Sequence, residues 1–182
     1  RVYNLKSGKD LGQLVQHQGS VTCVEFYKTE DSLGPTHLLS GSEDKSICVW
    51  RVGNWAHVKT LAGHKGAIND LAIHPTGNIA LSVSRDSSLR MWDLGSAKLA
   101  ARMHLKGGAA DIVQFTADGD DYILGTDKKV TMYSVDGCEE VLSLPHEKRV
   151  TCIATTEEED YALITATERG SILGWDTASG EK

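Results

Sequence analysis

Three residue types that together can cleave acyl bonds recur along this chain. Ser82 precedes Asp86 by four residues, and His64 lies upstream of both. A serine hydroxyl, an imidazole and a carboxylate joined by hydrogen bonds are the parts of a nucleophilic triad. The same types recur at the same serine–aspartate spacing, in His17, Ser40 and Asp44. Neither serine lies in the GxSxG context of a nucleophile elbow, and a catalytic set has no reason to occur twice, so a structural role is favoured.

Aromatic residues downstream of each aspartate show which elements position these side chains. Trp50, Trp92, Tyr133 and Trp175 each end a short run rich in β-branched residues, at intervals of 42, 41 and 42 residues. A period near 40 residues with several strands per unit is typical of a β-propeller blade. Gly, Asp and Asn interrupt the runs, and no stretch of a dozen residues has a helical period. We therefore predict an all-β fold.

The period divides the chain into five parts. We expect residues 1–16 to hold the end of a preceding blade, with a strand at Leu11–Val15. Blades should follow at 17–61 and 62–104, then a degenerate blade at 105–145 and a blade at 146–182 without its fourth strand. In the third blade Ile123 takes the serine position and Lys106 the histidine position. In the fourth blade Thr165 takes the serine position and Arg169 replaces the aspartate.

Repetition predicts one buried hydrogen-bonded chain per complete blade. Asp in the turn between the second and third strands can accept from His, His can reach the Ser hydroxyl, and Ser can accept from the Trp indole. Each buried polar group then has a partner. Two complete sets, which we call tetrads, are expected: His17, Ser40, Asp44 and Trp50 in the first blade, and His64, Ser82, Asp86 and Trp92 in the second.

These residues resemble those of the WD40 family, with Gly63-His64, Ser82, Asp86 and Trp92-Asp93 at that family's spacings. A narrower resemblance covers roughly residues 15–94 and is carried by Val21–Tyr27, His37–Asp44, Ile47–Trp50, Ile73–Gly77 and Leu89–Trp92. These segments resemble the PAK-interacting protein (Mak-eleven-type) group of ribosome-assembly WD40 proteins. That resemblance implies a WD40 β-propeller of more blades than the four seen here, usually seven.

The same resemblance implies a non-enzymatic scaffold in the nucleolus or nucleus that serves large (60S) ribosomal subunit maturation. Its partners would be pre-60S assembly factors or ribosomal proteins. Relatives in animals imply an alternative, a regulator that binds and inhibits a p21-activated kinase. Another WD40 adaptor, such as a ligase substrate receptor, also remains open, and an enzyme would need a pocket that joins polar residues from non-equivalent positions.

Composition narrows the range of partners. The net charge of −6 disfavours a protein that coats nucleic acid, so any RNA contact should be indirect or local. No CxxC pair occurs, and we expect neither metal nor cofactor. Cys23 and Cys152 occupy one repeat position, which predicts buried thiols in a reducing intracellular compartment. No apolar run approaches the roughly 18 residues of a membrane span.

Turns on one face of the blades form the expected surface for protein partners. They carry charges of both signs, which suits recognition of a protein and sets register and association rate. Candidates are Gln18, Lys65, Lys148 and Arg149 between blades, with Glu43, Lys45, Arg85, Lys128 and Arg169 between the second and third strands. The longer connection at Thr29–Thr36 is a second candidate surface, on the opposite face.

Residues 3–8 and residues 175–180 occupy the same position within the repeat. Because the resemblance to the narrower family implies more blades, we expect an open arc taken from a larger propeller. The rival prediction is that Leu11–Val15 supplies the fourth strand of the last blade and closes a small ring or a dimer.

Overall fold

A computed structural model describes residues 1–29, 32–156, 163–177 and 179–180. Its strands are β1 (Val2–Tyr3), β2 (Asp10–Gly12), β3 (Val21–Tyr27), β4 (His37–Ser42), β5 (Ile47–Arg51), β6 (His57–Leu61), β7 (Ile68–Ile73), β8 (Ile79–Ser84) and β9 (Ser88–Asp93). They continue as β10 (Lys98–His104), β11 (Ile112–Phe115), β12 (Asp121–Thr126), β13 (Lys129–Ser134), β14 (Glu140–Pro145), β15 (Val150–Thr155), β16 (Leu163–Thr167) and β17 (Ile172–Trp175). The part of the chain described here contains no helix long and apolar enough to cross a bilayer.

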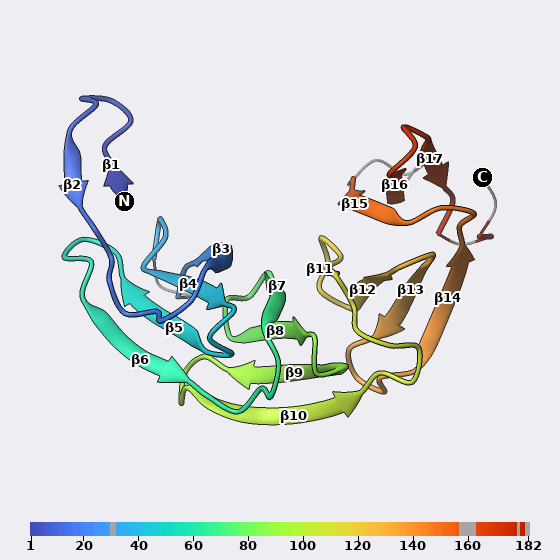
Figure 1. Cartoon of the computed structure of the whole chain (residues 1–182), viewed down its shortest axis with the longest axis horizontal. Coiled ribbons are helices and arrows are strands. Elements are labelled where there is room, and N and C mark those ends of the chain that lie inside the picture. The colour runs from blue at the N-terminus through green and yellow to red at the C-terminus, as the bar shows by residue number, and fades with distance from the viewer. Residues whose placement is uncertain (30–31, 157–162, 178, 181–182) are drawn as a thin grey trace.

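Antiparallel sheets, one per repeat, build the molecule. β3–β6, β7–β10 and β11–β14 each form a four-stranded sheet, β15–β17 a three-stranded sheet, and β1–β2 a pair. Figure 1 shows these sheets along an open arc. β6, β10 and β14 lie on its outside, and the β1–β2 pair and the β15–β17 sheet lie at its two ends. This arrangement confirms the all-β propeller prediction.

Apolar side chains fill the space between neighbouring blades, because each sheet alternates its residues between two faces. The first interface packs Leu39 and Ile47 against Leu71 and Trp92. The second packs the second blade against Val113 and its neighbours, and the third packs the third blade against the fourth. At each interface, the face of one blade that points along the arc toward the C-terminus contacts the face of the next blade that points toward the N-terminus.

Polar bonds cross every blade interface among the described residues. Across the first interface, Thr22 Oγ1 donates to the Ile68 carbonyl at 2.8 Å and Lys59 Nζ to the Ser96 carbonyl at 3.4 Å. Across the second, Asn69 Nδ2 donates to the Ala110 carbonyl at 2.8 Å, the Val113 amide to Asp70 Oδ2 at 3.0 Å, and His74 Nε2 to the Gly119 carbonyl at 3.0 Å. The third has Arg149–Asp111, Gln114–Thr155 and the Val150 amide to the Asp127 carbonyl at 2.8 Å.

The strand expected at Leu11–Val15 is shorter and differently paired. β2 covers Asp10–Gly12 and pairs with β1, so it does not complete the sheet of β15–β17 within the same chain. Leu14 instead packs against Leu38 and Trp50. Residues 13–16 do not continue β2, because the chain here crosses this apolar face and places His17 beside Ser40 and Asp44.

The third blade has a different register from the one expected. Leu124 pairs with Val113 as Ser82 pairs with Leu71, so Leu124, not Ile123, takes the serine position. Two residues join β12 to β13, whereas three join β8 to β9. The shorter turn shifts the strand by one residue, which moves Ile123 to the opposite face of the sheet.

The thiol prediction was wrong for Cys152. Cys23 is half-buried beside the second blade, but Cys152 is exposed. It lies on the face of the last blade that no described residue covers. All four cysteines lie in the described part of the chain and are free thiols.

Candidate functional site

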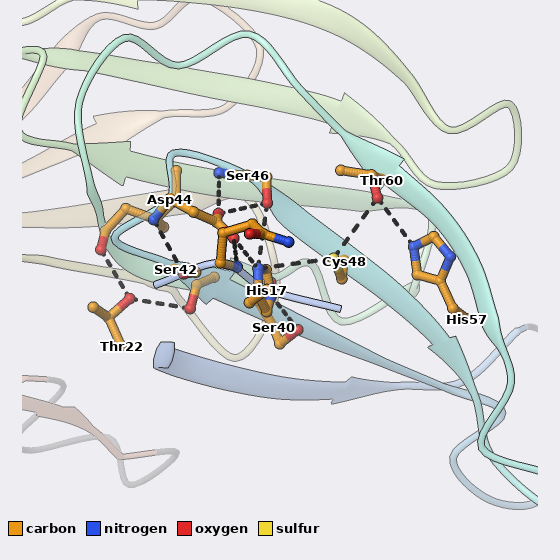
Figure 2. A network of polar contacts seen from close by, with 12 residues as sticks. His17, Thr22, Ser40, Ser42, Asp44, Ser46, Cys48, His57 and Thr60 are labelled. Carbon is orange, nitrogen blue, oxygen red and sulfur yellow. Dashed lines mark hydrogen bonds and ion pairs between the residues drawn. The ribbon is translucent and has the colours of Figure 1, made fainter. Parts of the chain in front are cut away.

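The first-blade tetrad residues form one hydrogen-bonded chain. Figure 2 labels three of them, His17, Ser40 and Asp44. Asp44 accepts from His17 Nδ1 at 2.9 Å, and the Ser40 hydroxyl donates to His17 Nε2 at 2.8 Å. The same hydroxyl accepts from the Trp50 indole at 2.8 Å. A β4–β5 turn supplies Asp44, while the segment after β2 supplies His17.

The second blade repeats this geometry. His64 Nδ1 lies 3.1 Å from Asp86 Oδ2, and the Ser82 hydroxyl lies 2.7 Å from His64 Nε2 and 2.9 Å from the Trp92 indole nitrogen. Ser82 has no exposed surface. A nucleophile must reach its substrate, and this hydroxyl is instead held inside the blade by two partners.

Both aspartates accept more bonds than the sequence predicted. Ser46 donates its hydroxyl to Asp44 at 2.6 Å, and Ser88 does the same to Asp86 at 2.6 Å. The backbone amides of Gln18 and Lys65 donate to the same carboxylates. Each carboxylate therefore links the turn that precedes its blade to the turn between the second and third strands of the same blade.

These bonds determine the charge state of the two carboxylates. Burial alone raises the pKa of Asp44 and of Asp86, but the hydroxyl, amide and imidazole donors outweigh it and hold both pKa values well below their usual range. Burial also lowers the pKa of His64, partly offset by Asp86. Asp44 and Asp86 are consequently ionised near pH 7, and His64 of the second-blade tetrad is neutral.

This charge state predicts a pH-dependent stability. A carboxylate whose pKa is depressed by folding stabilises the fold above the unfolded pKa of about 4, and that contribution is lost as pH falls below it. The variant Asp86→Asn should be less stable than the parent at pH 7, and the difference should shrink below about pH 4. Urea unfolding from pH 7 to pH 3 measures it. Asp136→Asn, at an exposed position, should follow the parent at every pH; a constant Asp86→Asn deficit would contradict the prediction.

The fourth blade keeps three members of the set although Arg169 replaces the aspartate. His146 Nε2 lies 2.8 Å from Thr165 Oγ1, which accepts from the Trp175 indole at 2.9 Å. His146 Nδ1 lies 3.0 Å from the Leu144 carbonyl, which takes the place of the missing acceptor. Thr165 supplies the hydroxyl here, while Lys106 and Leu124 leave the third blade without such a chain.

Arg90 is a buried residue that sequence reasoning missed. It is 6% exposed, donates from Nη2 to the Gly63 carbonyl at 2.5 Å and lies 6.0 Å from the centre of the Trp92 ring. Gly63 has a φ of +147°, and a Cβ there would meet the guanidinium. The sequence offered no signal for this burial, because an arginine within a strand is usually expected to face solvent.

The turns before each blade and the turns within it share one edge. Glu43 donates its amide to Ser20, Arg85 to Ala67, and Glu168 to Arg149. The candidate partner-binding residues lie on this edge, and all are exposed except the half-buried Lys148: Gln18, Glu43, Lys45, Lys65, Arg85, Lys128, Lys148, Arg149 and Arg169. Arg149 pairs with Asp111 at 2.7 Å, which raises the pKa of its guanidinium. We name these nine residues the turn edge.

The inner strands carry a shallow groove of about 460 Å³. Glu25 and Asp70 line it, and burial raises the pKa of each carboxyl. Asp70 is already bound to the Val113 amide across the second interface. Within the described part of the chain, no three His, Cys, Asp or Glu side chains are grouped so that they could hold a metal ion.

Comparison with known proteins agrees with this architecture. The family described as "WD domain, G-beta repeat" matches residues 8–51 and 55–93. A p21-activated protein kinase-interacting protein 1-like of Gallus gallus is 37% identical over 90% of this chain and 42% of its own length. One from Xenopus laevis is 35% identical over 98% of this chain and 47% of its own.

Protein MAK11 of Saccharomyces cerevisiae is 40% identical over 73% of this chain and 35% of its own length. The chain thus spans less than half the length of these relatives. The repeated sheets, the tetrads and these similarities agree: the chain contains WD40 repeats and is similar in sequence to p21-activated protein kinase-interacting protein 1-like proteins and to MAK11.

Proposed function

We propose that this chain is a non-enzymatic scaffold that binds protein partners through its turn edge. One observation carries the proposal: the only repeated Ser-His-Asp groups of the described chain are enclosed and bonded to tryptophan, while the charged turns beside them are exposed. The turn edge has seven cations and one anion, Glu43, which suits a protein partner with an acidic surface, while the net charge of −6 of the whole chain disfavours a protein that coats nucleic acid.

We further propose that the process served is assembly of the large ribosomal subunit in the nucleolus, with pre-60S factors or ribosomal proteins as partners. Support comes from the resemblance of the first two blades to ribosome-assembly WD40 proteins and from the similarity to MAK11. The names of the animal relatives support a second candidate, a regulator that binds a p21-activated kinase. Both proposals use the same turn edge.

Affinity purification of the tagged protein from cells tests the partner class. Recovery of 60S precursors with nucleolar staining supports the first proposal, and recovery of a kinase without ribosomal proteins supports the second. Recovery of neither contradicts both.

Charge reversal tests the turn edge itself. The double variant Lys65→Glu/Arg85→Glu should reduce partner recovery about tenfold, since reversed charges at an interface oppose association. The matched control, Lys28→Glu/Lys98→Glu, makes the same charge change at exposed positions away from the edge and should leave recovery unchanged. Equal losses in both variants would show a nonspecific effect of net charge and contradict a specific edge.

A further inference from the structure

Two arginines face each other on the outer strands of the second blade. Arg90 on β9 pairs with Arg102 on β10 in the antiparallel register, so both side chains leave the same face of the sheet. Figure 1 shows β10 on the outside of the arc, and Arg102 is exposed there. Residues paired in this way have Cβ atoms about 5 Å apart, and like charges directly opposite each other are destabilising. The pair therefore needs an explanation other than strand pairing.

The equivalent pairs in the neighbouring blades are neutral. In every four-stranded sheet, the residue two positions before the strand-ending aromatic faces a residue of the fourth strand: Cys48 faces Thr60, Arg90 faces Arg102, and Thr131 faces Ser143. Figure 2 shows the first of these pairs, with Cys48 Sγ 3.7 Å from Thr60 Oγ1. A blade of this type thus forms without charge at these positions, and the arginine pair is particular to the second blade.

The Arg90 guanidinium is fixed in place but incompletely bonded. It is 6% exposed, donates from Nη2 to the Gly63 carbonyl and lies 6.0 Å from the centre of the Trp92 ring. Its Nε atom is buried and has no hydrogen-bond partner among the described residues. Burial and the charge of Arg102 both lower the pKa of Arg90. Support of the Gly63 turn explains Arg90 by itself, but it gives no reason for a second arginine opposite it.

No carboxylate in the described part of the chain forms an ion pair with either arginine. The ion pairs among those residues involve other cations. The charge of Asp86 acts on Arg90 and raises its pKa, although less than burial lowers it. The oxygens of that carboxylate are bonded instead to Ser88, His64 and the Lys65 amide. Two guanidinium groups therefore share one face of the sheet without a bound anion.

We propose that Arg90 and Arg102 bind the phosphate group of a phosphorylated side chain on a protein partner. A phosphate monoester carries a charge of about −1.5 to −2 near pH 7 and has three acceptor oxygens, which suits two neighbouring guanidinium groups. A carboxylate carries one charge and would leave one arginine uncompensated. None of the turn-edge residues belongs to this site, so it does not depend on the function proposed for that edge.

A protein partner is favoured over RNA by the number of cations. The site consists of one arginine pair, which matches a single phosphate, whereas a nucleic acid presents a row of phosphates and is bound by many cations. Exposed Arg102 meets the phosphate first. Arg90 is held against Trp92 beforehand, so little side-chain freedom is lost when its charge acts on the ligand.

An NMR titration of the 182-residue chain, labelled with nitrogen-15, tests the site. The probe is a short peptide that contains one phosphoserine and no other charged group, and the unphosphorylated peptide is the blank. Saturable shifts are expected for the backbone amides of Gly63 and Arg102, with a dissociation constant of about 1 mM. The unphosphorylated peptide should cause no shift. Equal shifts with both peptides, or none with either, would overturn the proposal.

Substitutions on β10 separate a specific site from net charge. Arg102→Gln should weaken peptide binding at least about tenfold, because it removes one of two charged donors. Arg102→Lys should restore part of the affinity, since an ammonium keeps the charge but not the paired donors. Lys98→Gln is the matched control, because it removes one charge from an exposed position on the same strand, and it should bind as the parent does. Equal losses in Arg102→Gln and Lys98→Gln would contradict the site.

Stability provides a second, independent measurement. Without phosphate, Arg102→Gln should unfold at a higher urea concentration than the parent, because it removes a like-charge pair. Inorganic phosphate should then raise the urea midpoint of the parent more than that of the variant, since a ligand stabilises the state that binds it. A lower midpoint for Arg102→Gln without phosphate would mean that the pair serves the fold and would overturn the proposal.

Two further probes identify the source of the phosphate group. Inorganic phosphate and a short single-stranded RNA are titrated in the same way as the peptide. Binding of the phosphopeptide at least as tight as that of either probe supports a phosphorylated protein partner. Binding of inorganic phosphate without the peptide, or tighter binding of the RNA that Arg102→Gln abolishes, would assign the site to a different ligand and overturn the proposal.

Discussion

Replacing His64 with alanine is expected to lower the free energy of unfolding by about 3 kcal/mol. His64 is 6% exposed and joins the Asp86 carboxylate to the Ser82 hydroxyl. Its removal deprives a buried hydroxyl and an ionised carboxylate of one partner each and leaves a cavity beside the Trp92 ring. Losses of this kind cost about 1–3 kcal/mol for the unsatisfied groups, and the cavity adds to them.

Urea unfolding followed by tryptophan fluorescence measures this loss. His104→Ala is the matched control, because His104 is exposed on the outer strand β10, and it should change stability by less than about 0.5 kcal/mol. Equal stability of His64→Ala and the parent would mean that the tetrad contributes no net stability to the blade.

Replacing Gly77 with alanine is expected to lower stability by about 4 kcal/mol. Gly77 has a φ of +75°, which costs a residue with a Cβ about 1–2 kcal/mol. A Cβ here would also overlap the Lys28 carbonyl oxygen of the preceding blade. Because that oxygen is backbone, relief requires the two blades to move apart.

Gly53→Ala separates these two costs. Gly53 has a φ of +102°, but nothing lies within 4 Å of the position its Cβ would take. It should therefore lose only the backbone component. Urea midpoints of the two variants give the difference, and a Gly77→Ala loss no larger than that of Gly53→Ala would show that the close approach of the blades has no energetic consequence.

Much of the fold could be predicted because each sheet alternates apolar and polar residues between well-marked turns. The strand-ending aromatics that the sequence indicated, Trp50, Trp92, Tyr133 and Trp175, each lie within one residue of the end of a strand, in β5, β9, β13 and β17. The prediction for the third blade failed at its second strand, β12. Asp127 keeps the six-residue spacing to Tyr133, but the turn between β12 and β13 is one residue shorter than in the second blade. The spacing from Asp127 to Tyr133 does not include β12, so it cannot reveal a one-residue shift of that strand relative to Asp127.

The tetrad members could be picked out because four residue types repeat at fixed intervals. Ser46 and Ser88, which donate the shortest bonds to the aspartates, could not, since serine in a turn is ordinary. The burial of Cys152 was predicted wrongly because it depends on a neighbouring sheet, and Arg90 was missed because its partner Gly63 lies 27 residues away in the sequence. Blade-to-blade contacts join residues about 40 positions apart, and no local pattern records them.

The position of a blade in the arc determines how many neighbours hold it. Repeat arrays hold together through nearest-neighbour contacts, so partial opening begins where those contacts are fewest. A sheet at either end of the arc can separate by breaking a single interface, whereas the second or the third blade must break two. Cooperative unfolding should therefore spread inward from the ends, and the middle pair is the natural nucleus on which the outer sheets assemble during folding.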